Sequence, residues 1–113
     1  MCSRNTLDEI LKRFRAEAET VFGNKLQDVI LYGSYARGDN TEESDIDVMI
    51  IADISPNDEL ESSLKLTDIA VDLNLEFDVV LSPLVESKAK YEKYKHINPL
   101  FANIEREGIR IAA

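Results

Sequence analysis

Apolar residues recur at helical spacing in the first part of the chain, which predicts an amphipathic helix. Thr6 and Glu9 have the spacing of a capping box and mark its start, and Gly23-Asn24 marks its end. The apolar positions are Leu7, Ile10, Leu11, Phe14, Ala18, Val21 and Phe22. We expect this face of the helix to be buried.

Short runs of β-branched and aromatic residues predict three strands. The first covers about residues 26–32 and stops at Gly33, the second runs from Ser44 to Ile51, and the third runs from Glu76 to Leu81. The second run opens polar and becomes apolar on both faces, which is typical of a central strand with one end at a site.

Helices are predicted between and after these strands. Ser55-Pro56 starts a long one, because proline is tolerated in the first turn of a helix. Its buried side should consist of Leu60, Leu64, Thr67 and Val71. Ser82-Pro83 starts a helical stretch through about Lys95, and Asn98-Pro99 starts a short helix that Gly108 ends. This order predicts an α+β (mixed αβ) fold, a small mixed sheet packed by helices.

Length and composition restrict the class of protein. The 113 residues, 44% of them apolar, suffice for one core, so we expect a single domain over residues 1–113. The single cysteine, Cys2, excludes an internal disulfide and favours a reducing compartment. We expect a cytoplasmic protein without a membrane segment, because no apolar run approaches the roughly 20 residues that span a bilayer and no signal segment is evident.

The net charge of -9 is concentrated in the middle of the chain. Residues 38–86 carry 14 acidic side chains and one basic side chain, Lys65, which we expect to be solvated within its helix. Such a chain lacks the basic face that grips nucleic acid, so no direct nucleic-acid binding is expected. A bound cation would relieve the repulsion among these carboxylates.

The turn after the first predicted strand reads Gly33-Ser34-Tyr35-Ala36-Arg37-Gly38. Glycine lets the backbone approach a ligand closely, and exposed backbone N–H groups suit phosphate oxygens. It is not a P-loop, because Asp39-Asn40 stand where lysine and Ser/Thr are required. An EF-hand beginning at Asp39 also fails, since its sixth position is Ser44 and its twelfth is Ile50.

Asp45 and Asp47 alternate with Ile46, so both carboxylates should leave the same face of the strand. Carboxylate oxygens favour Mg²⁺ or Mn²⁺ over zinc. Asp78, near the start of the third predicted strand, could supply a third carboxylate, and Glu76, which shares its parity, is the rival candidate.

Gly33-Ser34, ten further residues and then Asp45-Ile46-Asp47 resemble the signature of the polymerase β-like nucleotidyltransferase superfamily. The flanking residues 31–38 and 44–48 are similar to those of its small prokaryotic branch, the minimal nucleotidyltransferases (MNT), antitoxins that accompany HEPN-domain toxins. The resemblance runs from the first predicted strand to the third.

The resemblance implies a polymerase β-like fold and a site for a nucleotide and metal. Gly33 and Ser34 would hold the triphosphate of ATP, and Asp45 and Asp47 would bridge two Mg²⁺ ions. Asp78 would complete the metal shell and help deprotonate the attacking hydroxyl. Arg37 is a further candidate for the phosphates, with a surface salt bridge as its equal alternative.

The resemblance also implies an acceptor, a tyrosine hydroxyl on the partner HEPN ribonuclease, which AMP transfer would disarm. The adjacent reading frame tests this expectation: a short helical protein with an Arg-x₄-His ribonuclease motif and a nearby tyrosine would support it. A basic and aromatic stretch offers a docking face, although a solvated helix side is the simpler interpretation. Its members are Lys88, Lys90, Tyr91, Lys93, Tyr94 and Lys95. For His96, the only histidine, nothing nearby suggests a ligand or a base.

Two other functions stay open on the sequence. One is a non-catalytic antitoxin that neutralises its partner by occlusion. The other is a nucleotidyltransferase subunit for a small molecule, as in aminoglycoside modification, which would need a homodimer or a companion chain to build the acceptor pocket.

Overall fold

The computed structural model describes residues 3–112, so Cys2, on which the disulfide prediction rests, lies outside the described part. The strands of that part form one mixed sheet in the order β3-β2-β1-β4. Strand β1 (Leu26–Tyr32) pairs antiparallel with β2 (Ile46–Ala52) and with the short β4 (Ile109–Arg110). Strand β3 (Leu81–Ser87) lies parallel to β2 at the edge of the sheet. The predicted α+β class with a small mixed sheet is confirmed.

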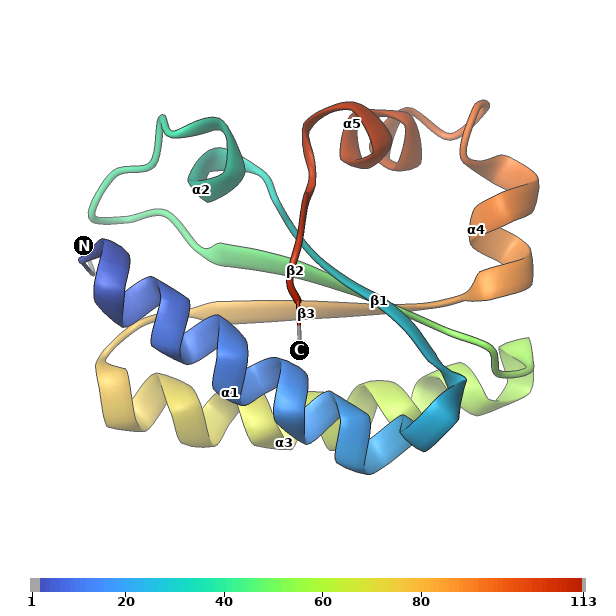
Figure 1. Cartoon of the computed structure of the whole chain (residues 1–113), viewed down its shortest axis with the longest axis horizontal. Helices are drawn as coiled ribbons and strands as arrows, with labels where there is room; N and C mark the ends of the chain where they lie inside the picture. The colour runs from blue at the N-terminus through green and yellow to red at the C-terminus, as the bar shows by residue number, and fades with distance from the viewer. Residues whose placement is uncertain (1–2, 113) are drawn as a thin grey trace.

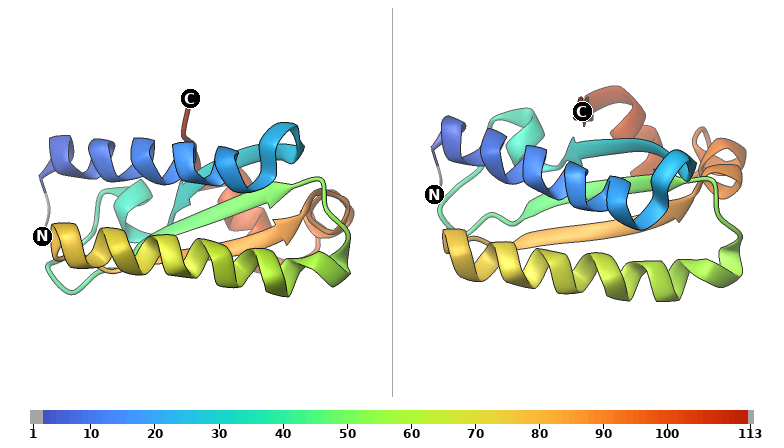
Figure 2. Two further views of the ribbon diagram at one scale, coloured as in Figure 1. Left: turned by 90° about the horizontal axis from the view of Figure 1, so that it is seen from below. Right: turned by 60° about the horizontal axis from the view of Figure 1, so that its bottom comes forward.

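Helices cover both faces of this sheet. α1 (Arg4–Phe22) and α3 (Glu59–Phe77) run side by side, in opposite directions, across one face (Figures 1 and 2). α4 (Lys88–Tyr94) and α5 (Pro99–Glu107) lie over the other face, and α2 (Ser34–Arg37) lies at one end of the sheet (Figure 1). No helix within residues 3–112 is long and apolar enough to cross a membrane.

Each face of the sheet has its own core, as the alternation of side chains along a strand requires. Val48 and Ile50 of β2 face α1 and α3, whereas Met49 and Ile51 belong to a second cluster with α4 and α5. β2 is buried almost throughout its length, which explains why its sequence is apolar on both faces. The polar start of β2 is the exception, and the candidate site lies there.

α1 buries the predicted apolar face but begins earlier than predicted. Its N-cap is Ser3, whose hydroxyl accepts a hydrogen bond of 3.1 Å from the backbone N–H of Thr6. The predicted capping box of Thr6 and Glu9 is therefore wrong, because Thr6 already lies in the first turn. The buried residues of this helix are Leu7, Ile10, Leu11, Phe14, Ala18 and Phe22.

The predicted third strand, residues 76–81, is placed too early in the chain. α3, preceded by a 3₁₀ turn at Pro56–Asp58, continues through Phe77, and β3 begins only at Leu81. The stretch from Ser82-Pro83 was predicted as helix, yet it is strand as far as Ser87. Pro83 fits there because β3 is an edge strand, whose outer side needs no ladder hydrogen bond from it.

The buried side of α3 is also the reverse of the prediction. Leu66, Ala70 and Leu73 face the core. The predicted face instead points outward, and its exposed fractions are 72% for Leu60, 59% for Leu64 and 47% for Val71. α3 therefore carries two apolar sides, one packed and one exposed.

Candidate active site

A glycine turn joins β1 to α2 at the end of the sheet. Gly33 has a φ of 74°, and its carbonyl accepts hydrogen bonds of 3.1 Å from the N–H groups of Ala36 and Arg37. The turn closes at Gly38, with a φ of 83°. Backbone of this hand suits glycine, since other residues adopt it only at a cost.

The Asp47 carboxylate packs directly against Gly33. A Cβ atom added to Gly33 would lie 2.5 Å from Oδ2 of Asp47, so the contact exists only because residue 33 lacks a side chain. Sequence reasoning placed both residues in the site by resemblance, and the structure brings them together.

Asp45 and Asp47 lie at the start of β2 and interact electrostatically. Burial and then the charge of Asp45 raise the pKa of the Asp47 carboxyl above its ordinary value, and the Arg37 guanidinium opposes them. A carboxylate whose pKa is raised by burial and by a neighbouring carboxylate favours a cation beside it. Asp45 and Asp47 thus lie close enough to interact electrostatically, and their role as a metal-binding pair stays a prediction.

Two neighbouring side chains were not singled out by the sequence. Asp47 lies opposite Tyr32 in β1 and Ser82 in β3. The Ser82 hydroxyl donates a hydrogen bond of 3.5 Å to Oδ2 of Asp45. Burial and then the charge of Asp47 raise the pKa of Tyr32. Sequence reasoning missed Ser82 because it placed the third strand at residues 76–81. The pairing of Ser82 with Asp47 follows only once β3 is known to start at Leu81.

Asp78 does not join the pair in the way the sequence predicted. It caps the C-terminal end of α3 in a left-handed conformation, with φ 54° and ψ 51°. Among residues 3–112 no group of three His, Cys, Asp or Glu side chains is placed to hold a metal. The rival candidate Glu76 forms a bidentate ion pair with Arg13 of α1. Because both residues precede β3, neither stands on the strand beside β2.

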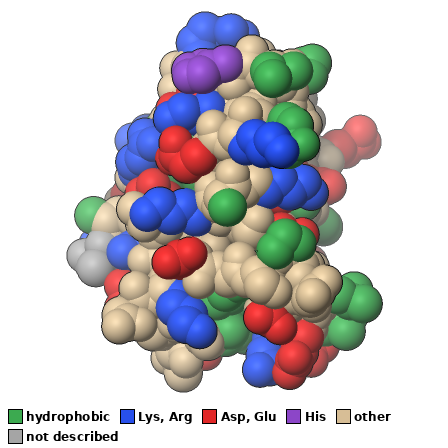
Figure 3. Space-filling view, turned by 90° about the vertical axis from the view of Figure 1, so that its right-hand side faces the viewer, with side chains coloured by type: hydrophobic (Ala, Val, Ile, Leu, Met, Phe, Trp, Pro, Cys, Tyr) green, Lys and Arg blue, Asp and Glu red, His purple; other side chains and the backbone are tan. Residues whose placement is uncertain are grey.

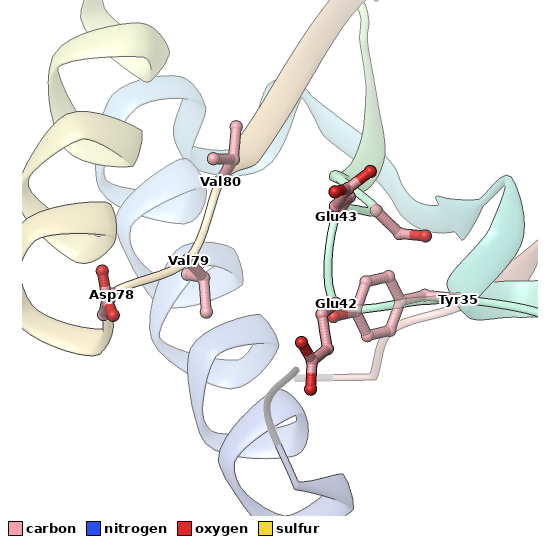
Figure 4. A pocket seen from close by; sticks show the side chains of 7 residues that line it. Tyr35, Glu42, Glu43, Asp78, Val79 and Val80 are labelled. Carbon is pink, nitrogen blue, oxygen red and sulfur yellow. The ribbon is translucent and has the colours of Figure 1, made fainter.

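A side pocket separates Asp78 from the glycine turn. Figure 4 shows Asp78 at the end of α3, across from Tyr35 and the loop that carries Glu42 and Glu43. This side pocket has a volume of about 210 Å³ and is lined by Tyr35, Glu42, Glu43, Ser44, Asp78, Val79 and Val80. Ser44, which lines the side pocket, immediately precedes Asp45, but neither Asp45 nor Asp47 is among the lining residues.

Arg37 is exposed beside the pair and already has two acidic neighbours. Its Nε atom lies 3.2 Å from Oδ2 of Asp39, and its Nη1 atom lies 3.7 Å from Oε2 of Glu107. These carboxylates raise the pKa of Arg37, Asp39 contributing most. Both readings of Arg37 are thus compatible with its position: it forms surface ion pairs and it acts electrostatically on Asp47.

The predicted basic and aromatic docking face is only partly exposed. Lys and Arg side chains do gather on this side of the molecule (Figure 3), but Tyr91 is buried against Phe101 with ring centroids 5.1 Å apart. Lys90 lies 3.4 Å from Glu86, and Lys95 lies 2.9 Å from Glu92. As an exposed surface of lysines and tyrosines, the prediction is wrong at Tyr91.

Lys65, by contrast, is exposed within α3, as predicted, and pairs with Glu61 at 3.7 Å.

Comparison with known proteins identifies the family to which the chain belongs. Residues 7–108 match the family described as the nucleotidyltransferase domain. The chain belongs to that family and is a nucleotidyltransferase.

Curated relatives narrow the class further. A protein of Methanocaldococcus jannaschii, provisionally named a protein adenylyltransferase, is 42% identical over 80 residues, covering 71% of this chain and 79% of the relative. A second protein of that organism with the same kind of name is 34% identical over 102 residues, covering 89% of this chain and 93% of the relative.

Solved structures share the fold at low sequence identity. A crystal structure of a toxin–antitoxin with AMP-PNP has a TM-score of 0.52 at 17% identity, covering 90% of this chain and 73% of that chain. A crystal structure of the toxin–antitoxin MntA-HpeT, in a mutant with two aspartates changed to glutamate, has a TM-score of 0.53 at 16% identity and the same coverage. These likenesses show that the chain shares the fold of these structures.

Proposed function

We propose that this chain transfers AMP from ATP to a tyrosine hydroxyl of a partner HEPN ribonuclease toxin and so acts as its antitoxin. The family, the names of the relatives and the toxin–antitoxin structures with the same fold support this proposal. The observation that carries it is the packing of the Asp47 carboxylate against the glycine of the Gly33-Ser34 turn.

The carboxylate pair fits a divalent cation, since burial and then the charge of Asp45 raise the pKa of Asp47 and the Arg37 guanidinium lowers it. We assign two Mg²⁺ ions, with Mn²⁺ as a substitute, to Asp45 and Asp47. When bound, these ions supply the positive charge that an acidic protein needs to hold a triphosphate and stabilise the departing pyrophosphate.

The residues around the pair have separate tasks in the proposal. Gly33 and Ser34 bring backbone close to the triphosphate, because residue 33 has no side chain to keep it away. Arg37, exposed beside Asp47, exchanges its surface carboxylates for a phosphate oxygen. The hydroxyl oxygen of the acceptor attacks the α-phosphorus, the bond to the β-phosphate oxygen breaks, and pyrophosphate leaves.

Asp78 is assigned to the acceptor side of the reaction. It lines the side pocket together with Ser44, the residue before Asp45, and we place the incoming hydroxyl there, whereas its position at the end of α3 does not support a place in the metal shell. There its carboxylate accepts the proton that the attacking hydroxyl releases.

Labelling with AMP tests the proposal. The purified chain, with Mg²⁺ and ATP labelled on its α-phosphate, should label the HEPN protein encoded beside it, and Asp45→Asn/Asp47→Asn should abolish the label. If the double variant labels as well as the parent, the assignment of the metal ligands is wrong.

The single-domain extent of residues 1–113, the homo- or hetero-oligomeric state and the cytoplasmic location stay predictions.

A second function, neutralisation by occlusion, is favoured by one observation: no third acidic side chain within residues 3–112 completes a metal-binding group. The two functions separate in cells. An antitoxin that works by occlusion still neutralises its toxin as Asp47→Asn, whereas an antitoxin that works by AMP transfer does not.

A further inference from the structure

α3 displays a row of four large apolar side chains to solvent, with the exposed Thr67 and Asp68 between its two halves. Its members have large exposed fractions: 72% for Leu60, 59% for Leu64, 47% for Val71 and 80% for Leu75. Their spacing keeps them on one side of the helix, because residues three, four and seven positions apart share a face. We call these four residues the α3 stripe.

The α3 stripe is additional to the packed side of the helix. Leu66, Ala70 and Leu73 already bury α3 against the sheet and α1, so the stripe contributes nothing to the core. Several large apolar side chains exposed along one side of a helix differ from apolar residues scattered singly over a surface, and we take the row as a candidate interaction site. Figures 1 and 2 show the outward side of α3 uncovered along its length by other elements.

The charges around the α3 stripe select the occupant. α3 carries five acidic side chains and one basic side chain, Lys65, and Lys65 is already paired with Glu61. Asp68 and Asp72 are exposed within the helix beside the stripe. Two copies of this chain meeting through α3 would bring these acidic rows together, so charge disfavours a second copy. A partner with basic residues around an apolar face would complement it.

The direction of α3 connects the stripe to the site. Leu75 lies in the last turn of the helix, and Asp78, Val79 and Val80, which follow that turn, line the side pocket. The C-terminal end of the stripe therefore leads to the side pocket, which Ser44 also lines. An acceptor protein gains most from this position, because docking outside the site holds its hydroxyl near the carboxylate pair.

We propose that the α3 stripe docks the acceptor protein through an apolar helical face flanked by lysine and arginine residues. This inference rests on the proposed function, because it takes the acceptor to be the partner toxin.

The test measures binding of this chain to the purified HEPN protein encoded beside it, by calorimetry without nucleotide. Leu60→Ser/Leu75→Ser, which changes both ends of the stripe, should weaken binding at least about tenfold. Ile97→Ser is the matched control, because Ile97 is 74% exposed and follows α4 on the other side of the sheet. It should bind as the parent does.

A charge variant tests the chemistry of the partner. Asp68→Lys/Asp72→Lys should slow association, and the difference from the parent should shrink as salt is added, because exposed charges are screened. Equal association rates for variant and parent at low salt would overturn the basic character assigned to the partner.

Failure of the docking proposal can be told apart from failure of the proposed function. The docking proposal is overturned if Leu60→Ser/Leu75→Ser binds as the parent does, if Ile97→Ser weakens binding equally, or if the parent is a dimer that the stripe variant dissociates.

Asp47→Asn should bind the partner normally and transfer no AMP. If the parent binds through the stripe yet never labels its partner, the stripe stands and the proposed transfer fails. If the parent does not bind the partner, both are overturned.

Discussion

Oδ2 of Asp47 occupies space that residue 33 leaves free only because it is glycine, since a Cβ there would lie 2.5 Å from that oxygen. Two motifs that are separated in the sequence, Gly-Ser and Asp-x-Asp, thus share one packed contact. The contact fixes the carboxylate against the backbone that we expect to receive the triphosphate.

Gly33→Ala should therefore lose both stability and nucleotide binding. The substituted residue would be strained at a φ of 74° and would also displace the Asp47 carboxylate. Gly38→Ala is the matched control, because φ is 83° there but nothing lies within 4 Å of an added Cβ. Backbone strain should cost Gly38→Ala, in the left-handed helical region, about 1–2 kcal/mol in the free energy of unfolding, and should cost Gly33→Ala, whose ψ of -153° lies in a region essentially restricted to glycine, about 1–3 kcal/mol. Only Gly33→Ala should lose ATP binding in the presence of Mg²⁺, and equal loss in both variants would refute the role of the contact.

The end of α3 shows what the sequence could not reveal. Residues 76–81 are rich in strand-forming types, but the helix continues to Phe77 because Asp78 can adopt a left-handed cap, which Asp tolerates better than most residues. The side chain of Asn74 then accepts a hydrogen bond of 2.7 Å from the N–H of Leu81, where β3 begins. Such a tertiary contact leaves no local pattern. By contrast, the Asp45-Ile46-Asp47 alternation could be read directly, because strand geometry alone sets its parity.

The two apolar sides of α3 illustrate a second limit. Helical periodicity identifies the Leu60, Leu64 and Val71 side as readily as the Leu66, Ala70 and Leu73 side, since steps of three, four and seven residues all keep side chains on one face. Which side is buried depends on how α3 packs against α1 and the sheet, and residue spacing carries no information about that packing. Sequence reasoning assigned the exposed side to the core and therefore did not identify it as a candidate docking surface.

Asp47→Asn should stabilise the protein at neutral pH when no divalent cation is present. Burial and the charge of Asp45 raise the pKa of Asp47 in the folded state, so its ionised form is unfavourable there. The stability of the parent should fall as pH rises above 3.8, the ordinary value for this carboxyl, and the advantage of asparagine should vanish below it. Thermal unfolding without metal measures this. Added Mg²⁺ should raise the unfolding temperature of the parent and not of Asp47→Asn, because a ligand stabilises only the state that binds it.

Asp78→Asn distinguishes an acceptor-side carboxylate from a metal ligand. Asp78 lines the side pocket and is not one of the two proposed metal ligands, Asp45 and Asp47. The affinity of Asp78→Asn for ATP with Mg²⁺ should therefore stay within about twofold of that of the parent. The rate of AMP transfer should fall by a factor on the order of 10² to 10⁴, as for loss of a proton acceptor. A comparable loss of metal-dependent ATP binding would show instead that Asp78 belongs to the metal shell.

Glu86→Gln should raise the stability of the fold at neutral pH. Glu86 is buried in β3, and burial and then the charge of Glu59 raise the pKa of its carboxyl more than Lys90, 3.4 Å away, lowers it. A carboxyl with a raised folded-state pKa contributes stability at low pH that is lost as pH rises through that pKa. The gain from glutamine should therefore be present at pH 7 and absent below about pH 4, where both states are protonated.

Glu92→Gln is the control of opposite sign for that measurement. Glu92 is exposed on α4, and its hydrogen bond and ion pair with Lys95, at 2.9 Å, lower the pKa of its carboxyl. Its contribution to stability is present above the ordinary glutamate pKa and is lost as pH falls through the lowered value, so glutamine should cost a little stability at pH 7 and nothing in strong acid. Urea unfolding from pH 3 to pH 8 compares the variants. If Glu86→Gln also lowers stability at pH 7, the Lys90 ion pair outweighs burial, and the carboxylate of Glu86 stabilises this edge of the sheet.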